Sequence, residues 1–168
     1  QGVSSTSLQL AAAVNVIANG GIYVAPKLVR AVVGPDGTQT PAPDAPSRRV
    51  VSEQAANQTA AMMQRVVCEG TATRAQVDNL PIAGKTGTAF KSAPNGTYYN
   101  EQGQRIYYAS FVGFFPADDP QVTVLVSVDE PPAGTNDRFG GTAAAPVFAA
   151  LVPTLIHELG IQPAPGST

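Results

Sequence analysis

Apolar residues recur at helical spacing in two stretches of the chain, each preceded by a small polar residue. The first stretch covers residues 7–19 and is rich in Leu and Ala. Thr6 or Ser7 is a suitable N-cap, because its hydroxyl oxygen can accept a hydrogen bond from a free backbone N–H of the first turn. The Asn-Gly-Gly sequence that follows is a typical stop signal, since glycine tolerates the left-handed conformation in which many helices end. The pattern predicts a helix over residues 7–19.

The second helical stretch begins after Ser52, another suitable N-cap, and places the acidic Glu53 in its first turn, where a negative charge is favourable. Gly70 is a suitable end for this helix. The apolar residues of the stretch lie three or four positions apart, as on one face of a helix: Ala56, Ala60, Met63, Val66 and Val67.

A third helix is predicted over residues 142–159, which are strongly apolar. Pro146 falls in the first turn, where its missing N–H does no harm. Pro153 falls in the interior, where we expect it to kink the helix.

Three later segments have the length and apolar content of β-strands. They cover residues 82–90, 107–115 and 122–128. The Pro-Ala-Asp-Asp-Pro sequence at 116–120 is a tight turn, so the second and third strands are predicted to be antiparallel neighbours. The polar residues 92–104 are predicted to form a long hairpin loop between the first and second strands.

The segment between the first two helices contains weaker strand signals. Residues 22–24 and 28–33 have strand character, and a Gly-Pro-Asp-Gly turn follows at 34–37. Residues 38–47 contain three prolines and no core-building pattern, which predicts an exposed connector. The whole order predicts an α/β (α+β) fold, in which helices pack on an antiparallel sheet.

Composition narrows the class of protein. The 168 residues are 43% hydrophobic and 13% charged, with a formal net charge of −2, which is typical of one folded domain with its own core. No basic stripe is present to neutralise phosphates, so nucleic acid is not an expected partner. The longest apolar stretch, residues 143–155, contains two prolines and is not expected to span a bilayer. The chain begins with Gln1 and not with an initiator Met, so we expect it to begin inside a longer gene product.

The chain has a single cysteine and a single histidine, which excludes a disulfide framework and argues against a metal cluster. Cys68 lies among apolar residues of the second predicted helix, so we predict a buried thiol. His157 lies near the end of the third predicted helix, where a cation is favourable.

The first of the three strands contains the sequence Lys85-Thr86-Gly87-Thr88. Side chains alternate along a strand, so Lys85 and Gly87 are predicted to share one face and the two threonines the other. A glycine inside a strand often marks the close approach of a ligand or another backbone. An ammonium group beside two hydroxyls can hold a carboxylate, and free N–H groups of an edge strand can pair with a peptide or stabilise an oxyanion. Taken alone, the motif is equally compatible with a surface lysine between turn glycines; a phosphate-binding loop is not expected, because its upstream glycine is missing.

The rest of the chain favours the ligand-binding interpretation. Lys-Thr-Gly is the third motif of the serine acyl-transferases that bind penicillin. Together with the other segments, it makes the chain resemble the C-terminal part of the transpeptidase domain of class B penicillin-binding proteins. The other segments that resemble the family occur in the family's order: residues 1–11, 18–21, 109–116, 124–131 and 140–148.

The resemblance implies roles for the motif. Lys85 would anchor the carboxylate of a stem peptide or a β-lactam, and the hydroxyls of Thr86 and Thr88 would hydrogen-bond the ligand. The strand, with Gly87 at its centre, would pair with the extended backbone of the substrate. The Thr88 N–H would form half of an oxyanion hole. The resemblance implies no metal and no cofactor.

Two other motifs of the family are absent from the sequence. No serine stands three residues before any of the lysines, and no serine has an asparagine two residues after it, so both Ser-x-x-Lys and Ser-x-Asn are missing. We therefore expect residues 1–160 to be the C-terminal part of a transpeptidase domain, with residues 161–168 as a tail. The nucleophile would belong to an N-terminal half outside this chain, and the isolated chain is expected to be inactive.

The resemblance also implies partners and a location. These are peptidoglycan stem peptides, β-lactam antibiotics, the N-terminal half of the same protein and proteins of a cell-division or elongation complex, on the extracytoplasmic side of the bacterial cell membrane. The Asp-Glu-Pro sequence at 129–131 favours a division enzyme over a lateral-wall one. Two alternatives remain at this stage: a fragment of a serine β-lactamase or β-lactam sensor, and a non-catalytic binding or structural domain.

Overall fold

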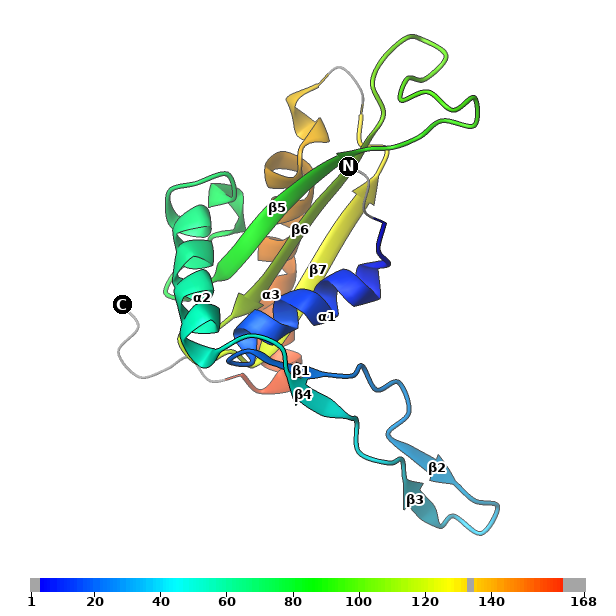
Figure 1. Cartoon of the computed structure of the whole chain (residues 1–168), viewed down its shortest axis with the longest axis vertical. Coiled ribbons are helices and arrows are strands. Elements are labelled where there is room, and N and C mark those ends of the chain that lie inside the picture. Colours follow the sequence, from blue (N-terminus) through cyan, green and yellow to red (C-terminus); the bar gives the residue numbers. More distant parts are fainter. Residues whose placement is uncertain (1–3, 133–134, 162–168) are drawn as a thin grey trace.

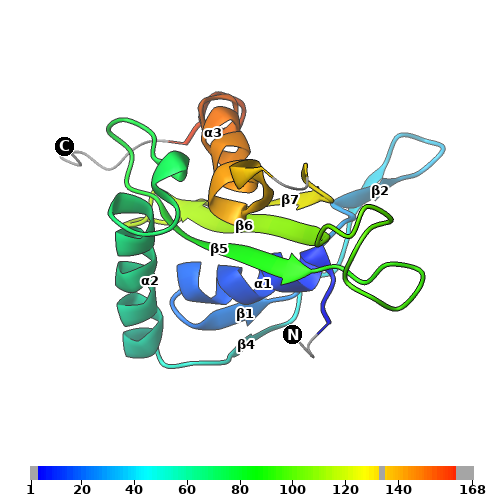
Figure 2. The same cartoon turned by 90° about the horizontal axis from the view of Figure 1, so that it is seen from above.

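A three-stranded antiparallel sheet forms the centre of the molecule in the computed structural model, which describes residues 4–132 and 135–161 (Figure 1). Its strands are β5 (Ala83–Phe90), β6 (Tyr107–Phe115) and β7 (Val122–Asp129), in the order β5-β6-β7. Helix α3 (Ala145–Leu159) covers one face, and helix α1 (Ser7–Ala18) covers the other (Figure 2). The predicted strands and their antiparallel pairing are confirmed.

Helix α2 (Glu53–Cys68) packs against β5 and α1. Its start is capped as predicted, because the Ser52 side chain accepts a hydrogen bond from the N–H of Ala55 at 3.2 Å. The predicted cap of α1 is also confirmed: Thr6 and Gln9 form a reciprocal capping box.

The core lies on both faces of the sheet. On the α3 side, the Phe148 ring packs edge-on against Phe111 and Phe115, with centroid distances of 4.8 and 5.9 Å. All three rings are fully buried, and each contributes about 2–3 kcal/mol through burial. A smaller cluster on the other side brings Met63 of α2 and Phe114 of β6 together with residues of α1.

A short π-helix, Gly140–Ala144, leads into α3. Pro146 falls in the first turn of α3 as predicted, and the helix continues through Pro153 to its end. The combined helical segment Gly140–Leu159 is 20 residues long with a mean hydropathy of 1.4. It is longer than the apolar stretch recognised in the sequence, and by length and composition alone it could cross a membrane. Because one side of it packs on the sheet, it also fits the core helix of a globular domain.

An arm projects from the body between α1 and α2 (Figure 1). Strand β1 (Ile22–Val24) pairs with β4 (Ser47–Arg49), and β2 (Ala31–Val33) pairs with β3 (Gln39–Pro41). Residues 38–47 are mostly exposed, as predicted, but they also contain β3 and the start of β4. The arm forms through backbone pairing around a turn, for example Gly34 N–H to the Thr38 carbonyl at 2.8 Å, and this pairing leaves no hydrophobic periodicity in the sequence.

Three single residues near the ends of α2 and α3 test further predictions. The prediction of a buried Cys68 was wrong: its thiol is exposed, since the apolar face of α2 is completed by Val67 and the last residue of the helix turns away from it. His157 lies in the last turn of α3 as predicted. Ile161, at the start of the expected tail, is buried in the core, whereas residues 162–168 and residues 1–3 of the first family-like segment lie outside the described residues.

Candidate functional site

Strand β5 is an edge strand of the sheet, and this places backbone donors on its open side. The N–H of Lys91, just after β5, donates to the Ile106 carbonyl at 3.0 Å. Successive residues of an antiparallel strand alternate between facing the partner strand and facing away from it. Thr86 and Thr88 are an odd number of residues from Lys91, so their N–H groups point toward the open edge.

The two faces of β5 are occupied as the alternation predicted. The hydroxyl of Thr88 accepts a hydrogen bond from the N–H of Gly140 at 3.1 Å, on the side where the chain enters α3. Gly87 faces the other side of the sheet, where a Cβ at this position would lie 2.5 Å from the Ser110 hydroxyl. Ala83, which shares the face of Lys85 and Gly87, packs in the cluster of α1 and α2.

The two threonines line a hollow of about 420 Å³, here called the threonine pocket. The Thr86 hydroxyl lies 2.9 Å from the hydroxyl of Thr71, which follows α2. The pocket is lined by five threonines, one arginine, one aromatic ring and one glycine: Thr71, Thr73, Arg74, Thr86, Thr88, Phe139, Gly141 and Thr142. Such a lining supplies several hydroxyl groups and one permanent cation, which suits a small anion such as a carboxylate.

Gly140 and Gly141 allow the start of the helical segment to lie directly on β5. A Cβ on Gly140 would overlap the carbonyl oxygen of Ser110, and a Cβ on Gly141 would overlap the carbonyl oxygen of Thr71. These two glycines are therefore required by close backbone approach. The sequence offered them only as part of a family-like segment, and it gave no signal for Thr71, which only the fold brings next to β5.

Lys85 lies at the open edge between the two faces. Its ammonium nitrogen donates to the carbonyl and hydroxyl oxygens of Thr86 at 3.1 and 3.3 Å. Its side chain is exposed, and the ion pairs found among residues 4–132 and 135–161 do not include it. The ammonium charge is thus available to an anion at the edge of β5.

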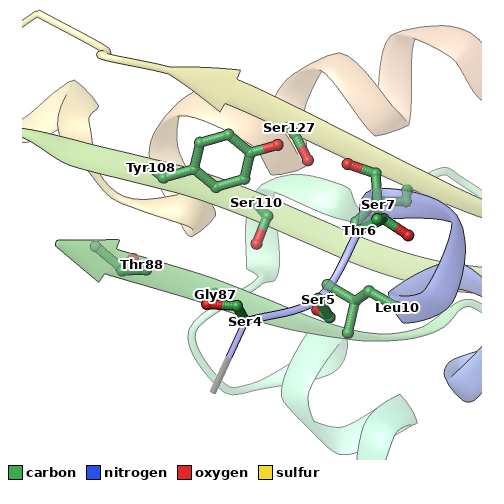
Figure 3. Close-up of a pocket in the computed structure, with 12 residues that line it drawn as sticks. Ser4, Ser5, Thr6, Ser7, Leu10, Gly87, Thr88, Tyr108, Ser110 and Ser127 are labelled. Atoms are coloured by element: carbon green, nitrogen blue, oxygen red, sulfur yellow. The ribbon is translucent and has the colours of Figure 1, made fainter. Parts of the chain in front are cut away.

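A second hollow, of about 400 Å³, lies on the opposite face of the sheet between β5 and the start of α1 (Figure 3). Ser127 and Ser7 donate hydrogen bonds to the phenolic oxygen of Tyr108, which hold the Tyr108 pKa below its ordinary value. The side chain of Ser110 and the backbone of Gly87 also line this hydroxyl pocket. Sequence reasoning did not find it, because its hydroxyls come from separate elements, among them α1, β6 and β7.

An antiparallel sheet between helices, with Lys-Thr-Gly on its edge strand, is the arrangement expected of a transpeptidase domain. The comparison with known protein families identifies the same domain. The family model for the penicillin-binding protein transpeptidase domain matches residues 1–152. The chain belongs to this family.

Relatives and solved structures give the same result. Stage V sporulation protein D of Bacillus subtilis is 38% identical over 97% of this chain and 24% of its own length. Penicillin-binding protein PbpB of Mycolicibacterium smegmatis is 35% identical over 99% of the chain and 26% of its own length. Penicillin-binding protein 3 of Mycobacterium tuberculosis, complexed with aztreonam, superimposes with a TM-score of 0.81 at 33% identity, covering 98% of this chain and 38% of that one. The chain thus spans about a quarter of the length of these two relatives, and the predicted fold is confirmed.

Proposed function

We propose that the chain is the C-terminal part of a peptidoglycan D,D-transpeptidase domain and supplies its substrate-binding strand. The observation that carries the proposal is the edge of β5, where the N–H groups of Thr86 and Thr88 point outward and the Lys85 ammonium donates to the hydroxyl of Thr86. Membership of the transpeptidase domain family supports it.

Each group of the strand has a distinct role in this proposal. The Lys85 ammonium attracts the terminal carboxylate of a stem peptide or of a β-lactam. The Thr88 hydroxyl already accepts a hydrogen bond from Gly140, so its own hydrogen remains available for that carboxylate. Thr86 provides a second hydroxyl, and the absence of a side chain on Gly87 lets the extended substrate backbone approach β5.

The outward N–H of Thr88 acts as one half of an oxyanion hole. A serine oxygen attacks the carbonyl carbon of the D-Ala-D-Ala bond, and negative charge develops on the carbonyl oxygen, where a fixed N–H donor stabilises it. The C–N bond then breaks, the terminal D-Ala leaves with a proton, and the acyl group stays on the serine. The amine of a neighbouring stem peptide attacks this ester, the ester C–O bond breaks, the serine oxygen takes up the proton that the amine loses, and the new amide bond is the cross-link. No metal or cofactor takes part in these steps.

The serine itself belongs to another part of the protein, since the sequence contains neither Ser-x-x-Lys nor Ser-x-Asn. Residues 1–160 thus act as part of one domain with an N-terminal half, and the chain by itself is inactive. β-Lactams are ligands of the assembled domain; the similar structures of Mycobacterium tuberculosis penicillin-binding protein 3 with aztreonam and with ampicillin support this. In this proposal the protein acts on the extracytoplasmic side of the cell membrane, with proteins of a cell-division or elongation complex as partners.

Labelling with a fluorescent penicillin tests the proposal. The full-length protein that contains this chain is expected to become covalently labelled, with the mass of one opened penicillin added. The isolated chain is expected to remain unlabelled, and Lys85→Ala is expected to reduce labelling of the full-length protein by at least about tenfold. Labelling of the isolated chain, or an unlabelled full-length protein, would overturn the proposal.

A further inference from the structure

An arginine in the lining of the threonine pocket forms an ion pair with an aspartate that lies two residues before the lining residue Phe139. Arg74 lies in the short 3-10 helix Thr73–Ala75, and Asp137 lies in the short 3-10 helix Asn136–Arg138. These two turns belong to the two segments that wall the pocket, one after α2 and the other before α3. The Arg74 Nη1 atom lies 3.7 Å from the Asp137 Oδ1 atom.

This ion pair is loose. Its distance exceeds the range of a good charge-assisted hydrogen bond, which is about 2.7–2.9 Å. The two side chains are 58% and 67% exposed, so water competes for both charges and the pair contributes little. Arg74 therefore keeps most of its five N–H donors available, in a planar arrangement that suits a carboxylate.

Arg74 is also placed differently from Lys85. Arg74 lines the threonine pocket together with Thr86 and Thr88. Lys85 shares its face of β5 with Gly87 and reaches the Thr86 hydroxyl only around the strand edge. If the threonine hydroxyls bind a carboxylate inside the pocket, the positively charged side chain nearest to it in the pocket lining is therefore Arg74.

We propose that Arg74 is a specificity-determining residue that binds the ligand carboxylate in the threonine pocket, and that Asp137 competes for it. Before a ligand binds, the loose pair joins the two walls. A ligand carboxylate displaces Asp137, because it can form shorter hydrogen bonds with the guanidinium group while also accepting bonds from the hydroxyls. This inference rests on the proposed function and adds a second cation to the recognition of the substrate carboxylate.

Acylation rates of the full-length protein with benzylpenicillin and with its methyl ester test this role, because the ester lacks the negative charge. Arg74→Gln is expected to lower the second-order rate constant for the acid by about tenfold and to change that for the ester by less than about twofold. Asp137→Asn is expected to raise the rate for the acid by about two- to threefold, since the competitor is gone. In the double variant, the gain from Asp137→Asn is expected to disappear.

A matched control is Arg65→Gln. Arg65 is 78% exposed, pairs with Glu69 at the C-cap of α2 and does not line the pocket, so the same loss of charge there is expected to leave both rates unchanged. If Arg74→Gln lowers the rates for acid and ester equally, or if Asp137→Asn leaves the acid rate unchanged, Arg74 has no role in charge recognition. A wild-type protein that neither penicillin acylates would overturn the proposed function itself. Melting temperatures of all variants separate these outcomes from misfolding, and Asp137→Asn remains decisive if Arg74→Gln does not fold.

Discussion

Gly140 donates its backbone N–H to the hydroxyl of Thr88 at 3.1 Å, a bond that joins residues 52 positions apart. It links the start of the C-terminal helical segment to the centre of the Lys-Thr-Gly strand. Since the N–H of Gly140 occupies an acceptor site of the hydroxyl, it also fixes the direction in which the hydroxyl hydrogen can point. The packing of the C-terminal helical segment and the orientation of the Thr88 hydroxyl on β5 therefore depend on the same hydrogen bond.

Thr88→Val is the first test of this arrangement, because it preserves shape and removes the hydroxyl. The N–H of the buried Gly140 loses its partner, which is expected to lower the free energy of unfolding by about 1–3 kcal/mol. Urea unfolding followed by circular dichroism measures this change. Thr88→Ser keeps the hydroxyl and is expected to retain most of the stability, so equal stability of the valine variant and the wild type would contradict the assigned bond.

Gly140→Ala tests the close approach of the two backbones. The added Cβ would overlap the carbonyl oxygen of Ser110 and crowd the backbone of Gly87. Because backbone atoms cannot move aside easily, we expect a loss of about 1–3 kcal/mol or more and weaker penicillin labelling of the full-length protein. At Gly37, a Cβ would meet open space but the φ angle is +82°, so Gly37→Ala isolates the conformational cost of about 1 kcal/mol and should leave labelling unchanged.

Phe148→Ala tests the main core. The ring is fully buried between β6 and α3, and its removal leaves a cavity, so a loss of about 3–5 kcal/mol is expected. The adjacent Val147 is 44% exposed, and Val147→Ala should cost less than about 1 kcal/mol. Comparable losses in the two variants, measured by thermal unfolding, would mean that α3 does not pack as described.

The ion pairs of Lys91 are expected to make the stability of the fold depend on pH in the alkaline range. Hydrogen bonds from its ammonium to Asp129 and then Glu130 raise the Lys91 pKa above its ordinary value. The folded state therefore holds this proton more tightly than the unfolded state. The stabilisation is fully present below the unfolded-state pKa of about 10.4 and is lost as the pH rises through the higher folded-state pKa.

The measurement is the melting temperature of the wild type and of Lys91→Met at several pH values between neutral and about pH 11. The wild type is expected to lose more stability than the variant across the alkaline part of this range. Lys27→Met serves as the control, because Lys27 donates to the Ala42 carbonyl rather than to a carboxylate, and it is expected to behave as the wild type. Parallel curves for Lys91→Met and wild type would show that the ion pairs do not stabilise the fold.

The parts of the fold that depend on local chemistry could be read from the sequence. Thr6 and Ser52 cap their helices because a hydroxyl next to a free N–H is a local interaction. The three main strands are marked by their apolar content, and the β6–β7 hairpin by its short turn. The position of Lys85 and the threonines on opposite faces of β5 followed from simple alternation.

Other features depend on contacts between distant segments, which leave no local pattern. Thr71 becomes part of the site only because α2 ends beside β5. Strand β3 (Gln39–Pro41) pairs with β2 through its backbone, and its side chains are all exposed and carry no periodicity. Cys68 is exposed because it is the last residue of α2 and lies outside the buried face formed by Ala56, Met63 and Val67.

The arm between α1 and α2 has a practical consequence for work on this protein. Its outer strands β2 and β3 pair with each other, and the valines of β2 remain exposed instead of joining the core. A Cβ added to Gly37, at the tip, would meet nothing within 4 Å, and exposed loop tips of this kind tolerate inserted sequence well. A fluorescent or affinity peptide placed there would mark the protein in a cell at a point that neither the sheet nor the threonine pocket touches.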